Sequence, residues 1–259
     1  MKIFFAGSET NSANLVLQAK GVQDRLYSFF SIKNTPGWLA NAHKMFPCIL
    51  LDSGGFVART KGVEIKIEEY GDFIAQNKQY VFAYANLDYK DTNRTLYNQN
   101  YLESRGLHPV PVYHVDEWLD KKYDLLDSYL AKYPYVALGG AAKDKGGKSV
   151  LHPFLSAMFA RSKGKTRFHG FGITDVQYLK KYPFYSVDST SWNQGGRYGN
   201  SLEYENFNIK SKKKDMHLFY RKNCGYKRRD DINIEVYLKM INEVNFLWKI
   251  RGINWTDTF

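Results

Sequence analysis

The sequence has little cysteine and no long hydrophobic run. Two cysteines in 259 residues, Cys48 and Cys224, exclude a disulfide framework and a cysteine-rich zinc site, so we expect one buried thiol and one loop thiol. No stretch approaches the roughly 18 consecutive apolar residues that a membrane-spanning helix needs. The opening stretch MKIFFAGSETNSANL becomes polar too early for a signal peptide. We therefore expect a cytoplasmic protein with no membrane partner.

Motifs for metals and nucleoside triphosphates are also missing. The sequence contains neither an HxH nor an HExxH pair, which are common spacings of metal ligands on one strand or helix. The stretch GGAAKDKGGK, residues 139–148, resembles a phosphate loop only faintly, because it lacks the fixed spacing between its first glycine and the Gly-Lys-Ser/Thr ending. We therefore predict no metal site, no triphosphate site and no bound cofactor.

Positive charge, by contrast, is abundant. The formal net charge is +11 and the pI is about 9.4, which favours a polyanionic partner such as a nucleic acid. The charge concentrates in the segment 210–229, where lysines and arginines alternate with aromatic residues that could stack on an unpaired base. A solvated loop with its aromatics packed on the core is the alternative. The candidate phosphate contacts are Lys212, Lys213, Lys214, Lys227, Arg228 and Arg229.

Short apolar stretches alternate with amphipathic ones along the chain, which predicts parallel strands joined by helices. The apolar spacing predicts a helix over 117–133, with Leu119, Tyr123, Leu126 and Leu130 on one face, and a C-terminal helix over 232–250. The strand count favours a compact α/β fold of the (β/α)8 TIM-like barrel type over an open sheet, although periodicity alone leaves both open. With no linker or repeat, we expect a single domain over 1–259. The predicted strands are 2–7, 48–56, 80–88, 109–115, 135–140, 167–174 and 184–190.

Polar residues and glycines mark the ends of six of these strands. Catalytic groups of parallel α/β proteins gather at the carboxyl ends of strands, so these residues are expected around one mouth. Each also has an ordinary explanation, since an Asp before a helix is usually an N-cap and a Gly after a strand is usually a turn. The residues are Asp52, Asp88, His114, Gly139 with Gly140, Gly170 and Asp188.

The order of these motifs resembles the tRNA-guanine transglycosylase superfamily. The matching stretches are DSGGF at 52–56, NLD at 86–88, the strand that ends at His114, YVALGG at 135–140, HGFGIT at 169–174 and VDSTSWNQGGRYG at 187–199. The family folds as a (β/α)8 barrel, and its members exchange a guanine of a polynucleotide for a 7-deazaguanine. DSGGF is the most specific match, and the aspartate loop that ends in Gly-Arg-x-Gly reinforces it.

The resemblance implies a role for each matching residue. Asp188 matches the nucleophile that attacks C1′ of the sugar, and Asp52 matches the acid/base that handles the proton of the departing and incoming bases. Asp88 matches the carboxylate that recognises the guanine edge. Arg197 matches an arginine in the loop that holds the polynucleotide. The remaining residues, which would contact the base, are Ser53, Gly54, His114, Gly139, Gly140 and Gly170.

The chain departs from the tRNA enzymes in informative ways. It lacks their zinc subdomain, with its three clustered cysteines and a histidine, and Val57 replaces the glutamine that usually follows DSGGF. These departures point to the compact, often virus-encoded branch of DpdA-like 7-deazaguanine DNA transglycosylases. We therefore expect an enzyme that replaces guanine in DNA by free preQ0 or a relative through a covalent aspartyl–sugar intermediate, in the host cytoplasm if phage-encoded. The alternatives are a tRNA enzyme, a sugar hydrolase and a non-catalytic nucleic-acid-binding barrel.

Overall fold

Eight strands in the described part of the chain form one all-parallel sheet. The computed structural model describes residues 1–140, 148–193, 201–205, 208–212 and 227–255. The strand order is β4-β3-β2-β1-β8-β7-β6-β5, and every neighbouring pair in it is parallel. The strands are β1 (Lys2–Phe5), β2 (Asp24–Ser28), β3 (Cys48–Asp52), β4 (Ala83–Tyr84), β5 (Val112–His114), β6 (Tyr135–Gly139), β7 (Arg167–Gly170) and β8 (Ser186–Ser189).

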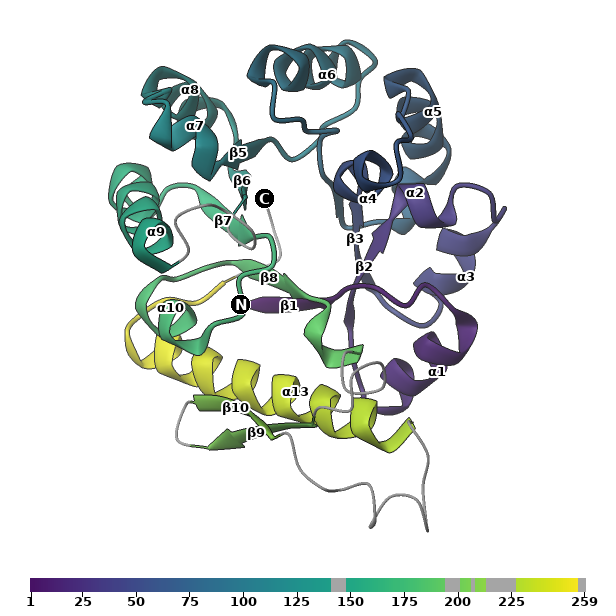
Figure 1. Cartoon of the computed structure of the whole chain (residues 1–259), viewed down its shortest axis with the longest axis vertical. Helices are drawn as coiled ribbons and strands as arrows, with labels where there is room; N and C mark the ends of the chain where they lie inside the picture. The colour runs from purple at the N-terminus through teal and green to yellow at the C-terminus, as the bar shows by residue number, and fades with distance from the viewer. Residues whose placement is uncertain (141–147, 194–200, 206–207, 213–226, 256–259) are drawn as a thin grey trace.

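The sheet curls around the centre of the molecule, and the helices lie outside it (Figure 1). Its two edges approach one another just beyond β4 and just before β5, where Ala85 and Val110 form an isolated parallel bridge. The amide of Asn86 donates to the carbonyl of Val110 (2.9 Å), and the amide of Val110 donates to the carbonyl of Tyr84 (2.8 Å). This curled α/β architecture is compatible with a TIM-like barrel.

Helices follow the strands in regular alternation, as the apolar periodicity predicts. Asp91 caps one of them with its side chain, which accepts from the amides of Asn93 and Arg94. The helices are α1 (Asn11–Ala19), α2 (Phe29–Ile32), α3 (Trp38–His43), α4 (Gly55–Thr60), α5 (Ile67–Asn77), α6 (Thr92–Ser104), α7 (Val115–Leu119), α8 (Tyr123–Lys132), α9 (Lys148–Ser162), α10 (Val176–Lys181) and α13 (Lys227–Ile250), with 3₁₀ turns η1 (Lys78–Tyr80) and η2 (Ser191–Asn193).

The single helix predicted over 117–133 is wrong, because the chain breaks between α7 and α8. Lys121 has a left-handed backbone (φ 58°). The amide of Lys122 donates to the carbonyl of Glu117 (2.9 Å), and the amide of Lys121 donates to the carbonyl of Trp118 (3.0 Å). This pair of hydrogen bonds is a Schellman helix end, which usually carries a glycine at the left-handed position. A lysine stands there instead, so the sequence conceals the break, and Leu119 is left exposed.

The sequence analysis also did not predict β2, which is one of the eight strands of the sheet. Its second residue is a charged one, Arg25, which is fully buried. The guanidinium donates to the backbone carbonyls of Phe5 and Gly7, the latter at 2.7 Å, and it lies 4.7 Å from the centre of the Tyr27 ring. These contacts satisfy the buried cation, so a residue type that normally argues against a buried strand is tolerated here.

Two apolar layers result from the strand alternation. Side chains that point outward, such as Phe5, Tyr27 and Val187, form the main core together with the helices. Side chains that point inward, such as Phe4, Leu50 and Tyr135, form two smaller clusters inside the curl, in which aromatic rings fill much of the space. Cys48 lies in one of these inner clusters, so the prediction of a buried thiol is confirmed, whereas Cys224 lies outside the described residues.

The C-terminal helix lies against the outside of the sheet beside a two-stranded hairpin (Figure 1). The predicted helix is confirmed as α13, which begins five residues earlier than its predicted start at 232. Its apolar stripe is buried at Ile234, Val244 and Trp248, and the Trp248 indole donates to the carbonyl of Leu179 at 2.8 Å. The antiparallel hairpin, β9 (Ser201–Glu205) with β10 (Asn208–Lys212), was not predicted. Within the described ranges, no helix is long and apolar enough to cross a membrane.

Candidate active site

Three carboxylates lie at or just beyond the carboxyl ends of parallel strands. Asp52 is the last residue of β3, Asp188 lies in β8, and Asp88 comes four residues after β4. Because parallel strands present their carboxyl ends at one edge, these groups are brought together although they are far apart in the sequence. Both Asp88 and Asp188 act electrostatically on Asp52. The structure thus gathers the three acids singled out in the sequence.

The turn after Asp52 is built from short hydrogen bonds and one left-handed glycine. The Gly54 amide donates to Asp52 Oδ2 (2.9 Å), and the Gly55 amide donates to Ser53 Oγ (3.2 Å). Gly54 has φ 74°, and a Cβ at this position would lie 2.2 Å from Ser28 Oγ and 2.6 Å from Phe30 Cβ. Glycine is therefore required at 54 for both conformation and space. Ser53 is fully buried, so its side chain holds the turn.

The environment of Asp52 favours its protonated form. Burial is the largest cause that raises its pKa, the negative charges of Asp88 and Asp188 raise it further, and the hydrogen bond from the Gly54 amide opposes them; the resulting pKa is about 7. A carboxyl group with such a pKa is present in both protonation states near neutral pH. It can therefore donate a proton in one step and accept one in another.

Asp88 has the opposite character because it is paired. Its Oδ2 lies 2.8 Å from Nε2 of His114, the last residue of β5. Burial acts to raise the pKa of Asp88, but the hydrogen bond and positive charge of His114, with a smaller contribution from the charge of Arg59, hold the pKa below its ordinary value. Burial likewise acts to lower the pKa of His114, and the bond to Asp88 reverses that effect and raises it. The pair is therefore favoured as a carboxylate with an imidazolium.

Neighbouring groups fix this pair in place. Glu117, which is 3% exposed, accepts a hydrogen bond from the His114 amide (2.9 Å) and another from Thr92 Oγ1 (2.9 Å). Arg59, one turn beyond the Asp52 turn, donates to the backbone carbonyl of Asp88 (2.9 Å). Neither Glu117 nor Arg59 was singled out in the sequence, because nothing in their local pattern separates them from ordinary helix surface charges.

Asp188 is held through one of its two oxygens. The Gly172 amide donates to Oδ1 (2.8 Å), and His169 Nε2 lies 3.4 Å from the same oxygen. Among the described residues, no hydrogen bond to Oδ2 is found, and the side chain is 11% exposed. A carboxylate with one oxygen held by hydrogen bonds and the other oxygen free of them suits a nucleophile, because the direction in which the second oxygen attacks is fixed.

The predicted glycines are close-packed, but against protein atoms. A Cβ at Gly139 would lie 2.8 Å from Cε1 of His114, and a Cβ at Gly170 would lie 2.9 Å from Cε1 of Phe184. Gly139 therefore leaves room for the imidazole that pairs with Asp88, which is a role the sequence did not reveal. Gly140 has a left-handed backbone (φ 82°) at the end of β6.

The predicted nucleic-acid contacts are described only in part. Arg197, Lys213 and Lys214 lie outside the described residues. Lys212 ends β10, and the backbones of Lys227, Arg228 and Arg229 form the first turn of α13. In the described part of the chain, no group of three or more His, Cys, Asp or Glu side chains is arranged to hold a metal ion.

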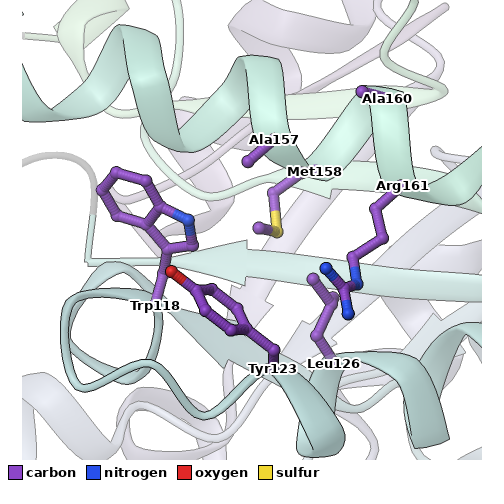
Figure 2. Close-up of a pocket in the computed structure, with 7 residues that line it drawn as sticks. All are labelled: Trp118, Tyr123, Leu126, Ala157, Met158, Ala160 and Arg161. Atoms are coloured by element: carbon purple, nitrogen blue, oxygen red, sulfur yellow. The ribbon is translucent and has the colours of Figure 1, made fainter.

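Two cavities described in the structure lie away from the three carboxylates. One, of about 340 Å³, opens between α7, α8 and α9 and is lined by Trp118, Tyr123 and Met158, with Arg161 at its border (Figure 2). The other, of about 890 Å³, lies at the amino ends of β4, β5 and β6, at the opposite end of the sheet from the acids.

A comparison with models of known protein families, and another with curated protein sequences, found no match to this chain.

Proposed function

We propose that the curled sheet closes into a (β/α)8 barrel and that the chain is a transglycosylase, which replaces guanine in DNA by a free 7-deazaguanine such as preQ0. The observation that carries the proposal is the set of three neighbouring acids in three different environments. Asp52 has a pKa of about 7, the pKa of Asp88 is held below its ordinary value by His114, and Asp188 has one anchored oxygen. Acid/base work, base recognition and nucleophilic attack need these three conditions.

In the first half-reaction, Asp188 Oδ2 attacks C1′ of the deoxyribose. The C1′–N9 bond breaks, its electron pair leaves with guanine, and protonated Asp52 supplies the proton that neutralises the departing base. The product is an ester between Asp188 and the sugar. The transition state has oxocarbenium character, which nearby carboxylates stabilise, as in retaining glycosidases.

The second half-reaction runs in the reverse sense with the new base. Asp52, now a carboxylate, accepts the N9 proton of the 7-deazaguanine while N9 attacks C1′. The C1′–Oδ2 bond breaks, and its electron pair returns to Asp188. Two displacements conserve the configuration at C1′, and no external energy source is consumed, in agreement with the absence of a triphosphate motif in the sequence.

Base recognition falls to Asp88 and His114. Guanine presents N1–H and its 2-amino group side by side, and a carboxylate accepts from both. An imidazolium on the other side of Asp88 keeps that carboxylate charged as it is desolvated by the base. The 7-deazaguanines share this edge with guanine, so one site serves both the outgoing and the incoming base.

A polynucleotide substrate agrees with the formal net charge of +11. A base inside a duplex cannot reach buried acids, so the enzyme must act on an unpaired or flipped-out base. DNA is favoured over tRNA because the chain lacks the cysteines of the tRNA enzymes' zinc site, and with two cysteines it cannot build that site.

The test is a base-exchange assay. The protein is incubated with guanine-labelled double-stranded DNA, single-stranded DNA or tRNA, each with preQ0, and release of labelled guanine is followed. The nucleophile is tested with Asp188→Asn, and the matched control is Asp120→Asn, which removes an exposed carboxylate paired with Lys122 at 3.7 Å. We expect release from DNA by the native protein and the control, and none by Asp188→Asn.

Other outcomes identify the alternatives. Release only from tRNA would establish the tRNA enzyme. Liberation of reducing sugar without any effect of preQ0 would indicate a hydrolase. Binding of DNA without release from any substrate would reject the enzyme in favour of a nucleic-acid-binding barrel.

A further inference from the structure

A buried histidine outside the predicted site contacts the proposed nucleophile. His169 lies in β7 and is 1% exposed. Its Nε2 atom lies 3.4 Å from Oδ1 of Asp188 and, among the described residues, has no hydrogen-bond partner that meets ordinary geometry. A buried imidazole nitrogen that is left without a good partner, and aimed at a reacting carboxylate, calls for an explanation.

The other ring nitrogen is firmly held. Nδ1 lies 2.7 Å from Oγ of Ser186 in the neighbouring strand β8, and that oxygen lies 2.5 Å from the hydroxyl of Tyr135 in β6. Aromatic rings also surround the imidazole, with the Phe171 ring centre at 4.5 Å and the Phe4 ring centre at 6.0 Å. The ring therefore cannot turn freely, and Nε2 is the nitrogen that it presents to Asp188.

We propose that His169 is a positioning residue for Asp188, an inference that rests on the function proposed above. Its Nε2 faces Oδ1 at 3.4 Å, and the Gly172 amide already donates to that oxygen; a hydrogen bond from Nε2–H that tightens when substrate binds adds a second donor at Oδ1 and leaves Oδ2 to attack C1′. This role uses the tautomer with the proton on Nε2, in which Ser186 Oγ donates to Nδ1 and accepts in turn from the Tyr135 hydroxyl, an arrangement that orients histidines in other reactive sites.

The two donors have a specific consequence for the second half-reaction. In the covalent intermediate, Asp188 is a neutral ester and Oδ1 is its carbonyl oxygen. When the C1′–Oδ2 bond breaks, the electron pair returns to the carboxylate and negative charge develops on both oxygens. Donors at Oδ1 stabilise that charge, so His169 makes Asp188 a better leaving group. Loss of the donor should therefore slow the release of the sugar from Asp188 more than it weakens DNA binding.

A pair of amide substitutions separates this role from simple packing. In His169→Gln the side-chain amide reaches the place of Nε2 and keeps a donor toward Asp188. In His169→Asn the amide reaches only the place of Nδ1, so it keeps the bond to Ser186 and loses the donor. We expect His169→Asn to lower kcat about tenfold to a hundredfold with little change in KM, and His169→Gln to retain most of the rate.

Two further readouts belong to the same experiment. The fraction of DNA that is covalently attached to the protein, measured on a denaturing gel during turnover, should rise in His169→Asn. In protein with ¹⁵N-labelled histidine, the Nε2 resonance of His169 should shift in Asp188→Asn and stay in place in Asp120→Asn. This second measurement keeps the native histidine, so it applies even if a His169 variant does not fold.

The results distinguish this inference from the proposed function. If the native protein exchanges guanine and His169→Asn is as active as the native protein, or the Nε2 resonance ignores Asp188→Asn, the positioning role is overturned while the function stands. If the native protein exchanges no base on any substrate, the proposed function is overturned and the role of His169 in it falls as well.

Discussion

Asp52 illustrates how one residue can be unfavourable for folding and yet suited to the acid/base role proposed for it. Its carboxyl group lies among two other acids in a poorly solvated place, and the folded protein therefore binds its proton more tightly than the unfolded chain does. Between the ordinary pKa of 3.8 and about 7, the unfolded chain has released a proton that the folded protein still holds. Stability must then fall as the pH rises through this window.

Asp52→Asn should accordingly stabilise the protein while abolishing base exchange. The asparagine oxygen can still accept from the Gly54 amide, but the residue no longer ionises beside Asp88 and Asp188. Because a unit of pKa corresponds to about 1.4 kcal/mol, we expect the variant's advantage to grow by roughly 2 kcal/mol between pH 5 and pH 8. Thermal unfolding at the two pH values measures it. An advantage that does not change with pH would show that Asp52 titrates normally.

The ion pair of Asp88 with His114 also contributes less stability as the pH rises, but in a higher window that begins near the ordinary histidine pKa of 6.5. A histidine whose pKa is raised by folding stabilises the protein fully below its ordinary value, and this contribution is lost as the pH rises through the raised value. His114→Gln keeps a donor toward Asp88 but removes the positive charge. We expect it to cost about 1 kcal/mol at pH 6 and much less at pH 9. The matched control is His43→Gln, at an exposed position on α3. An equal loss of stability in His114→Gln at both pH values would contradict the ion pair.

At the scale of the elements, the turn between β3 and α4 is where backbone geometry and chemistry meet. Gly54→Ala should be markedly destabilising, because an alanine would adopt a left-handed backbone and overlap Ser28 and Phe30. Gly62 provides the matched control, since it has nearly the same φ (68°) with no atom within 4 Å of the added Cβ. We expect a loss of about 1 kcal/mol for Gly62→Ala and of at least 2 kcal/mol for Gly54→Ala in chemical denaturation.

The activities of the same two variants carry the second half of this prediction. Gly54→Ala should also displace Asp52, whose Oδ2 accepts from the residue's amide, and should reduce base exchange strongly. Gly62→Ala lies at the far end of α4 and should leave exchange unchanged. Equal losses of stability in Gly54→Ala and Gly62→Ala would mean that the turn at Gly54 rearranges to accommodate the added Cβ and that its close packing does not contribute to stability.

The sequence predicted elements well where apolar residues were periodic and failed where a tertiary contact replaced a local signal. Strands β1, β3 and β6 and helix α13 follow directly from their apolar patterns. The strand β2 was missed because Arg25 is satisfied by carbonyls of the β1–α1 segment, which no local pattern encodes. The break before α8 was missed because Lys121 stands where a glycine would have signalled it.

The site shows the same division. Asp52, Asp88, His114 and Asp188 could be found because strand ends are readable and parallel strands bring their ends together. Their pairing could not be found, because it depends on side-chain directions. Whether His114 lies against Asp88, or His169 against Asp188, is decided by which strands are neighbours and by the packing of rings inside the curl. His169 could not be singled out, since its only local signal is a polar side chain in a buried strand.

At the scale of the whole molecule, the excess of positive charge predicts how nucleic-acid binding should respond to salt. The formal net charge is +11, and each lysine that neutralises a DNA phosphate contributes about −0.9 to the slope of log K against log salt concentration. Replacing Lys212, Lys213 and Lys214 together by Gln should make the slope less steep by about 2 to 3 and weaken binding to any DNA sequence alike.

The control for that experiment removes the same charge near the amino ends of two strands of the sheet. Lys78 precedes β4, and Lys163 and Lys165 precede β7; all three are exposed. Replacing these by Gln also lowers the formal net charge by three, so it would match the first variant if only the overall charge attracted DNA. We expect the control to keep the native slope in filter binding or fluorescence titration from low to moderate salt. Identical slopes in the two variants would instead place the phosphate contacts outside residues 212–214, because a diffuse charge responds to number and not to position.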